Sequence, residues 1–138
     1  MHYKHKQDLL LIRLSEGEEI FPTLTNLLTQ LNVEEGFIVS AIGQLKRFKL
    51  GYFKEKGDFQ PTYYEKPHEL LALTGSITKN EDYVYHLHAQ LADAQKTVYG
   101  GHLIGGMVSV TCEILFQKTN FGFIRIKDEE TGLMALKP

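Results

Sequence analysis

Residues 83–103 read YVYHLHAQLADAQKTVYGGHL, which indicates two β-strands joined by a short polar turn. From Tyr83 the odd positions are mostly apolar, whereas the even positions carry His86, His88 and Gln90. Side chains alternate between the two faces of a strand, so both histidines are expected to project from the face opposite the core. Residues two apart on one face lie ~6.5–7 Å apart at Cα. Two imidazoles at that spacing can reach one metal ion.

The next predicted strand carries a third histidine, His102. The polar stretch 92–96 indicates a hairpin turn that returns His102 to the neighbourhood of His86 and His88. A symmetric turn places it opposite residue 87. A shift of one residue, which the preceding glycine pair would allow as a β-bulge, places it opposite one of the two histidines instead. The sequence therefore predicts three adjacent histidines without deciding whether all three share a face.

Three imidazoles with an open fourth position suit Zn²⁺ or another borderline divalent ion. The alternative is that the histidines are hydrogen-bonded residues on a solvated or subunit-facing strand. Glu113 lies on the polar face of a predicted strand at 107–117, where it could bind the metal or orient an imidazole. Glu113 and Glu69 are also the acid/base candidates if a metal activates water.

The rest of the chain predicts an α+β domain with a mainly antiparallel sheet. Its one main helix is expected at about residues 22–31, with Pro22 at the first helical position. Short turns separate the strands, and Gly75 is a candidate bulge position. With 138 residues the chain fits one domain, with a core at about 8–127 and tails at 1–7 and 128–138. The strands are predicted at 8–14, 37–42, 45–53, 60–65, 70–78, 84–91, 97–103, 107–117 and 122–127.

Composition narrows the function. A net charge of -2 and a pI of about 6.3 do not favour nucleic-acid binding. The one basic cluster includes Lys46, Arg47 and Lys49, which read more readily as a solvated strand than as a phosphate-binding surface. Cys112 is the single cysteine, so an intrachain disulfide is excluded and a cytoplasmic location is expected. No segment is long and apolar enough for a signal peptide or a membrane span.

Four motifs in order resemble the plant and prokaryote conserved (PPC) domain: ELLALTGSI at 69–77, HLHA at 86–89, GGHL at 100–103 and TCEI at 111–114. The tripeptide AIG at 41–43 also matches, and the resemblance extends over about residues 10–117. It implies a compact α+β domain with a major antiparallel sheet that assembles as a homotrimer.

The resemblance also bears on partners and cofactors. Plant members follow an AT-hook that binds the minor groove of DNA, but this chain has no Arg-Gly-Arg-Pro core. It is therefore similar to the stand-alone prokaryotic members, which are regarded as DNA-binding proteins by analogy. Several of these resemble metal binders through the histidines that match His86, His88 and His102. The resemblance thus implies a three-histidine site for a divalent metal, with Zn²⁺ the expected ion.

We therefore expect a homotrimeric, non-enzymatic protein with a DNA-binding or regulatory role and a three-histidine metal site. One alternative is a metal-dependent, hydrolase-like enzyme that uses a zinc-bound water. Another is a metal-free protein that binds a small molecule at the trimer interfaces.

Overall fold

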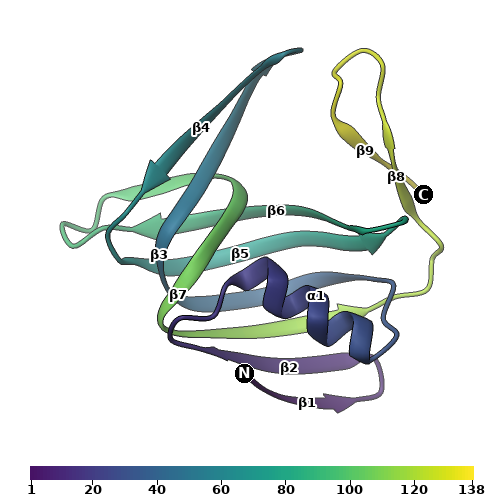
Figure 1. Cartoon of the computed structure of the whole chain (residues 1–138), viewed down its shortest axis with the longest axis horizontal. Helices are drawn as coiled ribbons and strands as arrows, with labels where there is room; N and C mark the ends of the chain where they lie inside the picture. The colour runs from purple at the N-terminus through teal and green to yellow at the C-terminus, as the bar shows by residue number, and fades with distance from the viewer.

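The alternating apolar residues of the chain build a strongly curved β-sheet with a single helix packed on one side of it (Figure 1). The computed structural model describes residues 1–138. The elements in chain order are β1 (His2–Lys6), β2 (Leu9–Ser15), α1 (Ile20–Gln30), β3 (Glu35–Glu55), β4 (Asp58–Tyr64), β5 (His68–Lys79), β6 (Tyr83–Ala92), β7 (Val98–Lys118), β8 (Ile124–Lys127) and β9 (Met134–Lys137).

The main sheet has the strand order β1-β2-β7-β6-β5-β3-β4, and every neighbouring pair is antiparallel. Strands β7 and β3 also pair directly, so β3, β5, β6 and β7 close a ring of hydrogen-bonded pairs. Strands β8 and β9 form a separate antiparallel hairpin. The predicted fold class, α+β with a mainly antiparallel sheet and one helix, is confirmed.

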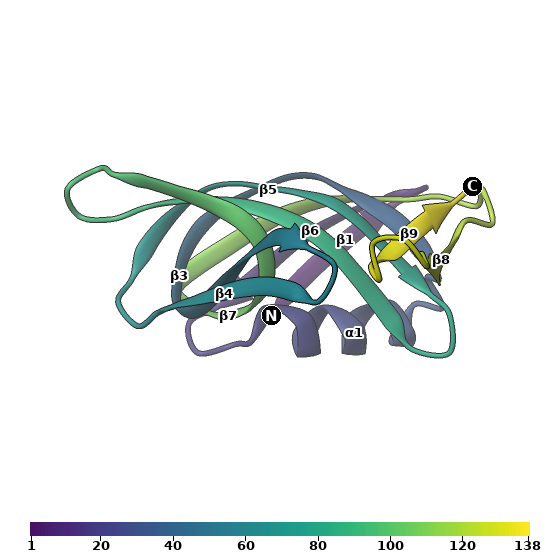
Figure 2. The same ribbon diagram turned by 90° about the horizontal axis from the view of Figure 1, so that it is seen from above.

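Helix α1 lies on one side of this sheet (Figure 2). We call the side that packs on α1 the inner face and the opposite side the outer face. The inner face contributes most of a core of 24 buried hydrophobic residues, to which α1 adds Ile20, Leu24, Leu27 and Leu28. None of the chain's helical segments combines the length and the apolar character needed to cross a bilayer.

The helix begins earlier than the predicted range of 22–31. It runs from Ile20 to Gln30, because Ile20 extends the apolar stripe by one turn and is fully buried. Pro22 is therefore the third helical residue, not the first. It is still tolerated, because the N–H groups of the first turn have no partner within the helix. Asn32, with φ of 51°, turns the chain out of the helix.

Strands β3 and β7 are longer than predicted, because each joins two expected strands through bulges. Gly43, which falls between the strands predicted at 37–42 and 45–53, continues β3 with φ of 152°. A Cβ there would lie 2.1 Å from the Thr111 carbonyl oxygen, so only glycine fits. Gly75 is not a bulge, since it pairs with Ile38 and Leu87, and the β5 bulge lies between Leu70 and Ala72.

Both segments expected as tails contain strands. Residues 2–6 form β1, which extends the sheet edge by pairing with β2. Residues 134–137 form β9, which pairs with β8. Their mixed polar composition hides this structure in the sequence, because edge strands and short hairpins carry little apolar alternation.

Candidate metal centre

Strand β6 presents its residues as the alternation predicts. Leu87 and Ala89 are buried on the inner face, whereas His86 and His88 are exposed on the outer face. Tyr85 marks the inner side directly, since its ring stacks on Phe21 of α1 with 4.3 Å between centroids. The histidine pair therefore lies on the side of the sheet that α1 does not cover.

The β6–β7 hairpin places His102 directly opposite His88. Its turn is fixed by Asp93, whose Oδ1 accepts hydrogen bonds from the backbone N–H groups of Gln95 and Thr97, both at 2.9 Å. This turn aligns Ala92 with the first residue of β7 and moves the register by one residue from the symmetric arrangement. Because directly paired residues share a face, His102 joins the other two histidines on the outer face.

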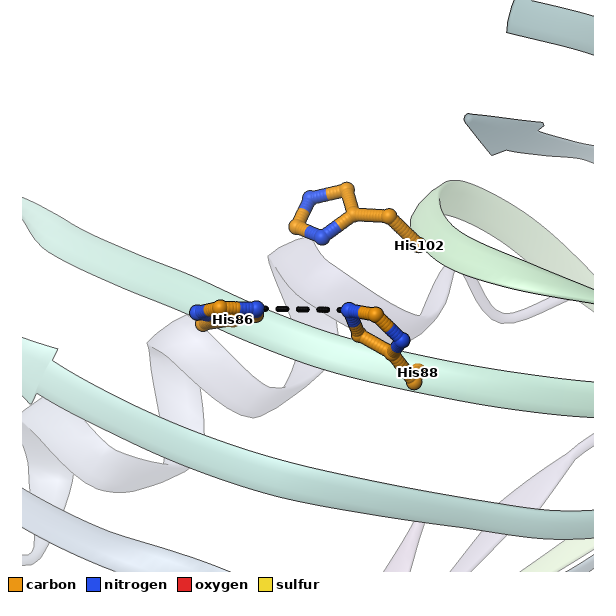
Figure 3. A group of neighbouring side chains, drawn as sticks. All are labelled: His86, His88 and His102. Carbon is orange, nitrogen blue, oxygen red and sulfur yellow. Dashed lines mark hydrogen bonds between the residues drawn. The ribbon is translucent and has the colours of Figure 1, made fainter. Parts of the chain in front are cut away.

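The three imidazoles surround one small space, and their rings turn nitrogen atoms toward it (Figure 3). One ligand nitrogen from each of His86, His88 and His102 can be chosen so that all three lie within 4.8 Å of one another. The Nε2 atoms of His86 and His88 are 3.3 Å apart. A tetrahedral metal ion at about 2.0–2.1 Å from each nitrogen needs donors roughly 3.3–3.4 Å apart, which is the separation of the His86–His88 pair.

The electrostatics of the cluster favour neutral rings. Burial, together with the charge of Arg125 and of the other two rings, lowers the pKa of His86 to about 4. Burial and the neighbouring charges of His88 and Arg125 also lower the pKa of His102. A neutral imidazole is the form that binds a metal, so these two rings are in the ligand state at neutral pH.

A cavity of about 730 Å³ opens over the three histidines. The ring of Phe59 in β4 packs edge-on against His102, at 5.9 Å between centroids. Gly51 in β3 makes this possible, because a Cβ there would lie 2.0 Å from the Phe59 ring. The far side of the cavity includes Leu133 and Met134 of the C-terminal segment. In Figure 1 the β3–β4 and β8–β9 hairpins rise on the same side of β6.

Arg125 also lines this cavity, although its position in the sequence did not mark it as a candidate site residue. In β8 the alternation predicts that Ile124 and Ile126 face inward, yet they are 41% and 45% exposed. Arg125 is only 5% exposed, and its guanidinium donates to Ser76 Oγ and the Met134 carbonyl oxygen, both at 2.8 Å. Arg125 lies two residues after the buried Phe123, and this spacing was the only indication in the sequence that it would be buried. The apolar Ile124 and Ile126 indicated the opposite face as the buried one.

The two candidate carboxylates do not join the histidine group. Glu69 pairs with Ala92 at the far end of β6 and accepts a hydrogen bond from Gln44 Nε2 at 2.7 Å. Glu113 lies in the C-terminal half of β7, where it pairs with Arg13 of β2 and Ile42 of β3. The donor set at the site is therefore three imidazoles with no carboxylate within the 4.8 Å group.

The basic cluster in β3 is largely paired with acidic side chains. Lys46 Nζ lies 3.2 Å from Glu16, and Arg47 Nε lies 3.0 Å from Glu65. Lys49 is exposed and makes none of the chain's ion pairs. Pairing with carboxylates reduces the local positive potential that attraction to phosphates would require.

Comparison with curated proteins finds the same domain within much longer chains. The bifunctional protein GlmU of Synechococcus sp. strain JA-2-3B'a(2-13) is 33% identical over 127 residues, which is 91% of this chain and 19% of that protein. The chain spans about a fifth of the length of the curated relatives it matches.

Solved structures share the fold over nearly the whole chain. A candidate DNA-binding protein from Ralstonia eutropha JMP134 is 25% identical with a TM-score of 0.89, covering 99% of this chain and 95% of that one. A metal-containing protein from Archaeoglobus fulgidus is 24% identical with a TM-score of 0.83, covering 99% and 97%. The family model of the Plants and Prokaryotes Conserved domain, abbreviated PCC or PPC, matches residues 1–120. The chain therefore belongs to this family.

Proposed function

We propose that this chain binds one divalent metal ion, zinc, through His86, His88 and His102, and that it acts as a homotrimeric binding or regulatory protein. The observation that carries the metal site is the convergence of three imidazole nitrogens within 4.8 Å of one another. The fold of the metal-containing A. fulgidus protein is the same, which supports the proposal.

The donor set fits zinc better than magnesium or calcium, because those ions prefer oxygen ligands and none is in the group. Three protein ligands leave a coordination position that can accept an outside donor. This chain's own residues hold the ligands in place: the paired strands β6 and β7 fix His88 and His102, and Phe59 packs against the His102 ring.

A hydrolase-like role is less well supported than a binding role. Such an enzyme needs a general base within reach of the activated water, and a carboxylate is the usual choice. Neither Glu69 nor Glu113 belongs to the histidine group. The metal-free small-molecule alternative does not account for the convergence of three imidazole nitrogens on one space.

Trimer formation is supported by apolar side chains on the outer face. Leu9 and Leu11 of β2 and Ile42 of β3 are between 42% and 59% exposed there. Both strands pair with β7. Exposed apolar patches on a soluble domain commonly mark association surfaces. The trimer predicts that Leu11→Glu yields a smaller species by light scattering after gel filtration. The matched control is Phe121→Glu, at a 78% exposed position near the chain's C-terminal segment, which should leave the mass unchanged.

DNA association is part of the regulatory proposal because the R. eutropha relative is a candidate DNA-binding protein. A net charge of -2 and the paired basic residues predict weak binding at most. Real binding should fall steeply as salt rises, because it would depend on counterion release. The cytoplasmic location also stays a proposal, and the buried thiol of Cys112, whose pKa burial raises to about 12, is consistent with it.

The metal site is tested by elemental analysis of protein purified without an affinity tag. We expect one zinc per chain in the wild type and in His5→Ala, an exposed histidine of β1 that serves as the control. His88→Ala and His102→Ala should each weaken zinc binding by more than about 100-fold, since loss of an outer-shell partner alone costs 10–100-fold. Unchanged zinc content in both variants would remove the site.

A further inference from the structure

Arg125 is a buried cation without an anionic partner. Its side chain is 5% exposed, and none of the chain's five ion pairs involves it. Its two hydrogen bonds go to neutral groups, the Ser76 hydroxyl and the Met134 carbonyl, and its Nε has no partner. A buried charge is normally retained only where an opposite charge compensates it.

Arg125 and the three histidines line the same cavity. His86 connects them through the sheet, since it pairs with Ser76, which accepts the hydrogen bond from Arg125. The cavity therefore contains two cationic features when a metal is bound, and it holds no carboxylate among its lining residues.

Two opposite walls of the cavity carry apolar side chains. Phe59 covers one side, and Leu133 and Met134 cover the other. Phe59 is 41% exposed, and Leu133 and Met134 are each 42% exposed. A ligand that enters the cavity would therefore bury apolar surface against them. A ligand that matches these walls has an anionic end and an apolar body.

We propose that this cavity binds a small organic anion, a carboxylate or phosphate monoester with an apolar body. Its oxyanion lies between Arg125 and the three-histidine centre, and its body lies between Phe59 and Met134. The guanidinium fork suits either oxyanion, because both accept paired N–H donors. The proposal rests on the proposed metal site, because the metal supplies one of the two cationic groups that contact the oxyanion. It identifies the class of ligand that this site binds.

Calorimetric titration with three aromatic probes tests this ligand class. Benzoate and phenyl phosphate carry the two oxyanions, and benzamide is the neutral isostere of benzoate. On the zinc-loaded wild type we expect at least one of the anions to bind more tightly than benzamide. The stronger anion then distinguishes a carboxylate from a phosphate ligand. Equal affinity for benzamide and both anions, or no binding of either anion, would overturn the proposal.

Variants of Arg125 separate anion recognition from a structural role. Arg125→Gln should weaken the preferred anion by about 10- to 100-fold, the usual range for a lost charge-assisted hydrogen bond. It should leave benzamide binding and zinc content unchanged, and Arg125→Lys should restore part of the anion affinity. The control is Arg47→Gln, at an exposed arginine in β3. If Arg125→Gln weakens benzamide and the anion equally, Arg125 only holds the β8–β9 hairpin and the proposal fails.

The same titrations on metal-free protein keep the two proposals apart. If the chain binds no zinc, the proposed metal site fails by elemental analysis. An anion preference that still depends on Arg125 would nevertheless support the anion site. If zinc binds but the preference for anions is absent, only the inference about Arg125 is contradicted.

Discussion

The two faces of strand β6 share one backbone but differ in the burial and the chemistry of their side chains. On the inner face Leu87 is fully buried, and the Tyr85 hydroxyl lies 2.6 Å from Thr25 Oγ1 of α1. On the outer face His86 and His88 are exposed and meet only each other, His102 and the cavity. The difference teaches that alternation along one strand separates the residues that stabilise the fold from the residues that bind ligands.

This separation has a physical basis. The inner positions bury apolar area in the hydrophobic core, which is the main favourable contribution to folding. The outer positions open into the cavity and are not packed into the core, so polar side chains there can contact a ligand. Substitutions on the inner face should therefore change stability, while those on the outer face should change metal binding.

The largest effect is expected for Leu87→Ala. Leu87 is fully buried in the core, so its truncation should lower the free energy of unfolding by about 2–5 kcal/mol. His88→Ala, one residue away on the opposite face, should change it by less than about 0.5 kcal/mol in metal-free protein. Urea unfolding in the presence of a chelator measures both. Comparable losses for the two variants would break the distinction between the faces.

The next largest effect is expected for a substitution of Gly75. This residue lies in β5, which pairs with β6, the strand that carries His86 and His88. With φ of 135° and a Cβ that would lie 2.0 Å from the His86 carbonyl oxygen, alanine cannot fit without moving β6. We expect Gly75→Ala to cost at least about 1–3 kcal/mol of stability and to weaken zinc binding as well. Gly105→Ala is the control, because nothing lies within 4 Å of its Cβ position. A stable Gly75→Ala protein with normal zinc affinity would show that the strand position is not constrained.

A smaller loss is expected for Tyr85→Phe. The hydroxyl of Tyr85 also donates to the Phe21 carbonyl oxygen at 3.2 Å, and burial raises its pKa to about 12. Its removal should lower the free energy of unfolding by about 0.5–1.5 kcal/mol without changing zinc content. Tyr52→Phe, at a 68% exposed position, should have no effect on unfolding. Zinc loss in Tyr85→Phe would mean that the inner face positions the metal ligands more directly than we infer.

The smallest effect is a pH dependence of stability in metal-free protein, because the histidine rings are partly solvated. The pKa of His86 is about 4 in the folded chain and about 6.5 when unfolded. Between these values the unfolded state binds more protons, so the free energy of unfolding should fall as the pH drops from about 6.5 to about 4. Urea titrations over that range should show a shallower fall for His86→Gln than for the control His5→Gln. Equal slopes would contradict the lowered pKa.

The antiparallel fold and the grouping of the three histidines could be predicted from the sequence, because apolar alternation is strong in the central strands. The period of two placed His86 and His88 on one face, and the short polar turn brought His102 beside them. Both predictions depend only on backbone geometry, which varies little between proteins.

Other features could not be predicted, since they depend on contacts between distant segments. The hairpin register was set by Asp93, whose hydrogen bonds to the turn are a local choice among several. Arg125 is buried against the apolar alternation of its own strand, because Ser76 and Met134 supply its hydrogen-bond partners. Departures from local pattern of this kind are expected where a protein binds something.

The central claim is that three imidazoles share one metal ion, and zinc K-edge X-ray absorption tests it most directly. Protein carrying one zinc per chain should show three imidazole nitrogens at about 2.0–2.1 Å, and His102→Ala should show fewer. A wild-type spectrum with fewer than three imidazoles, or one that His102→Ala leaves unchanged, would contradict the account.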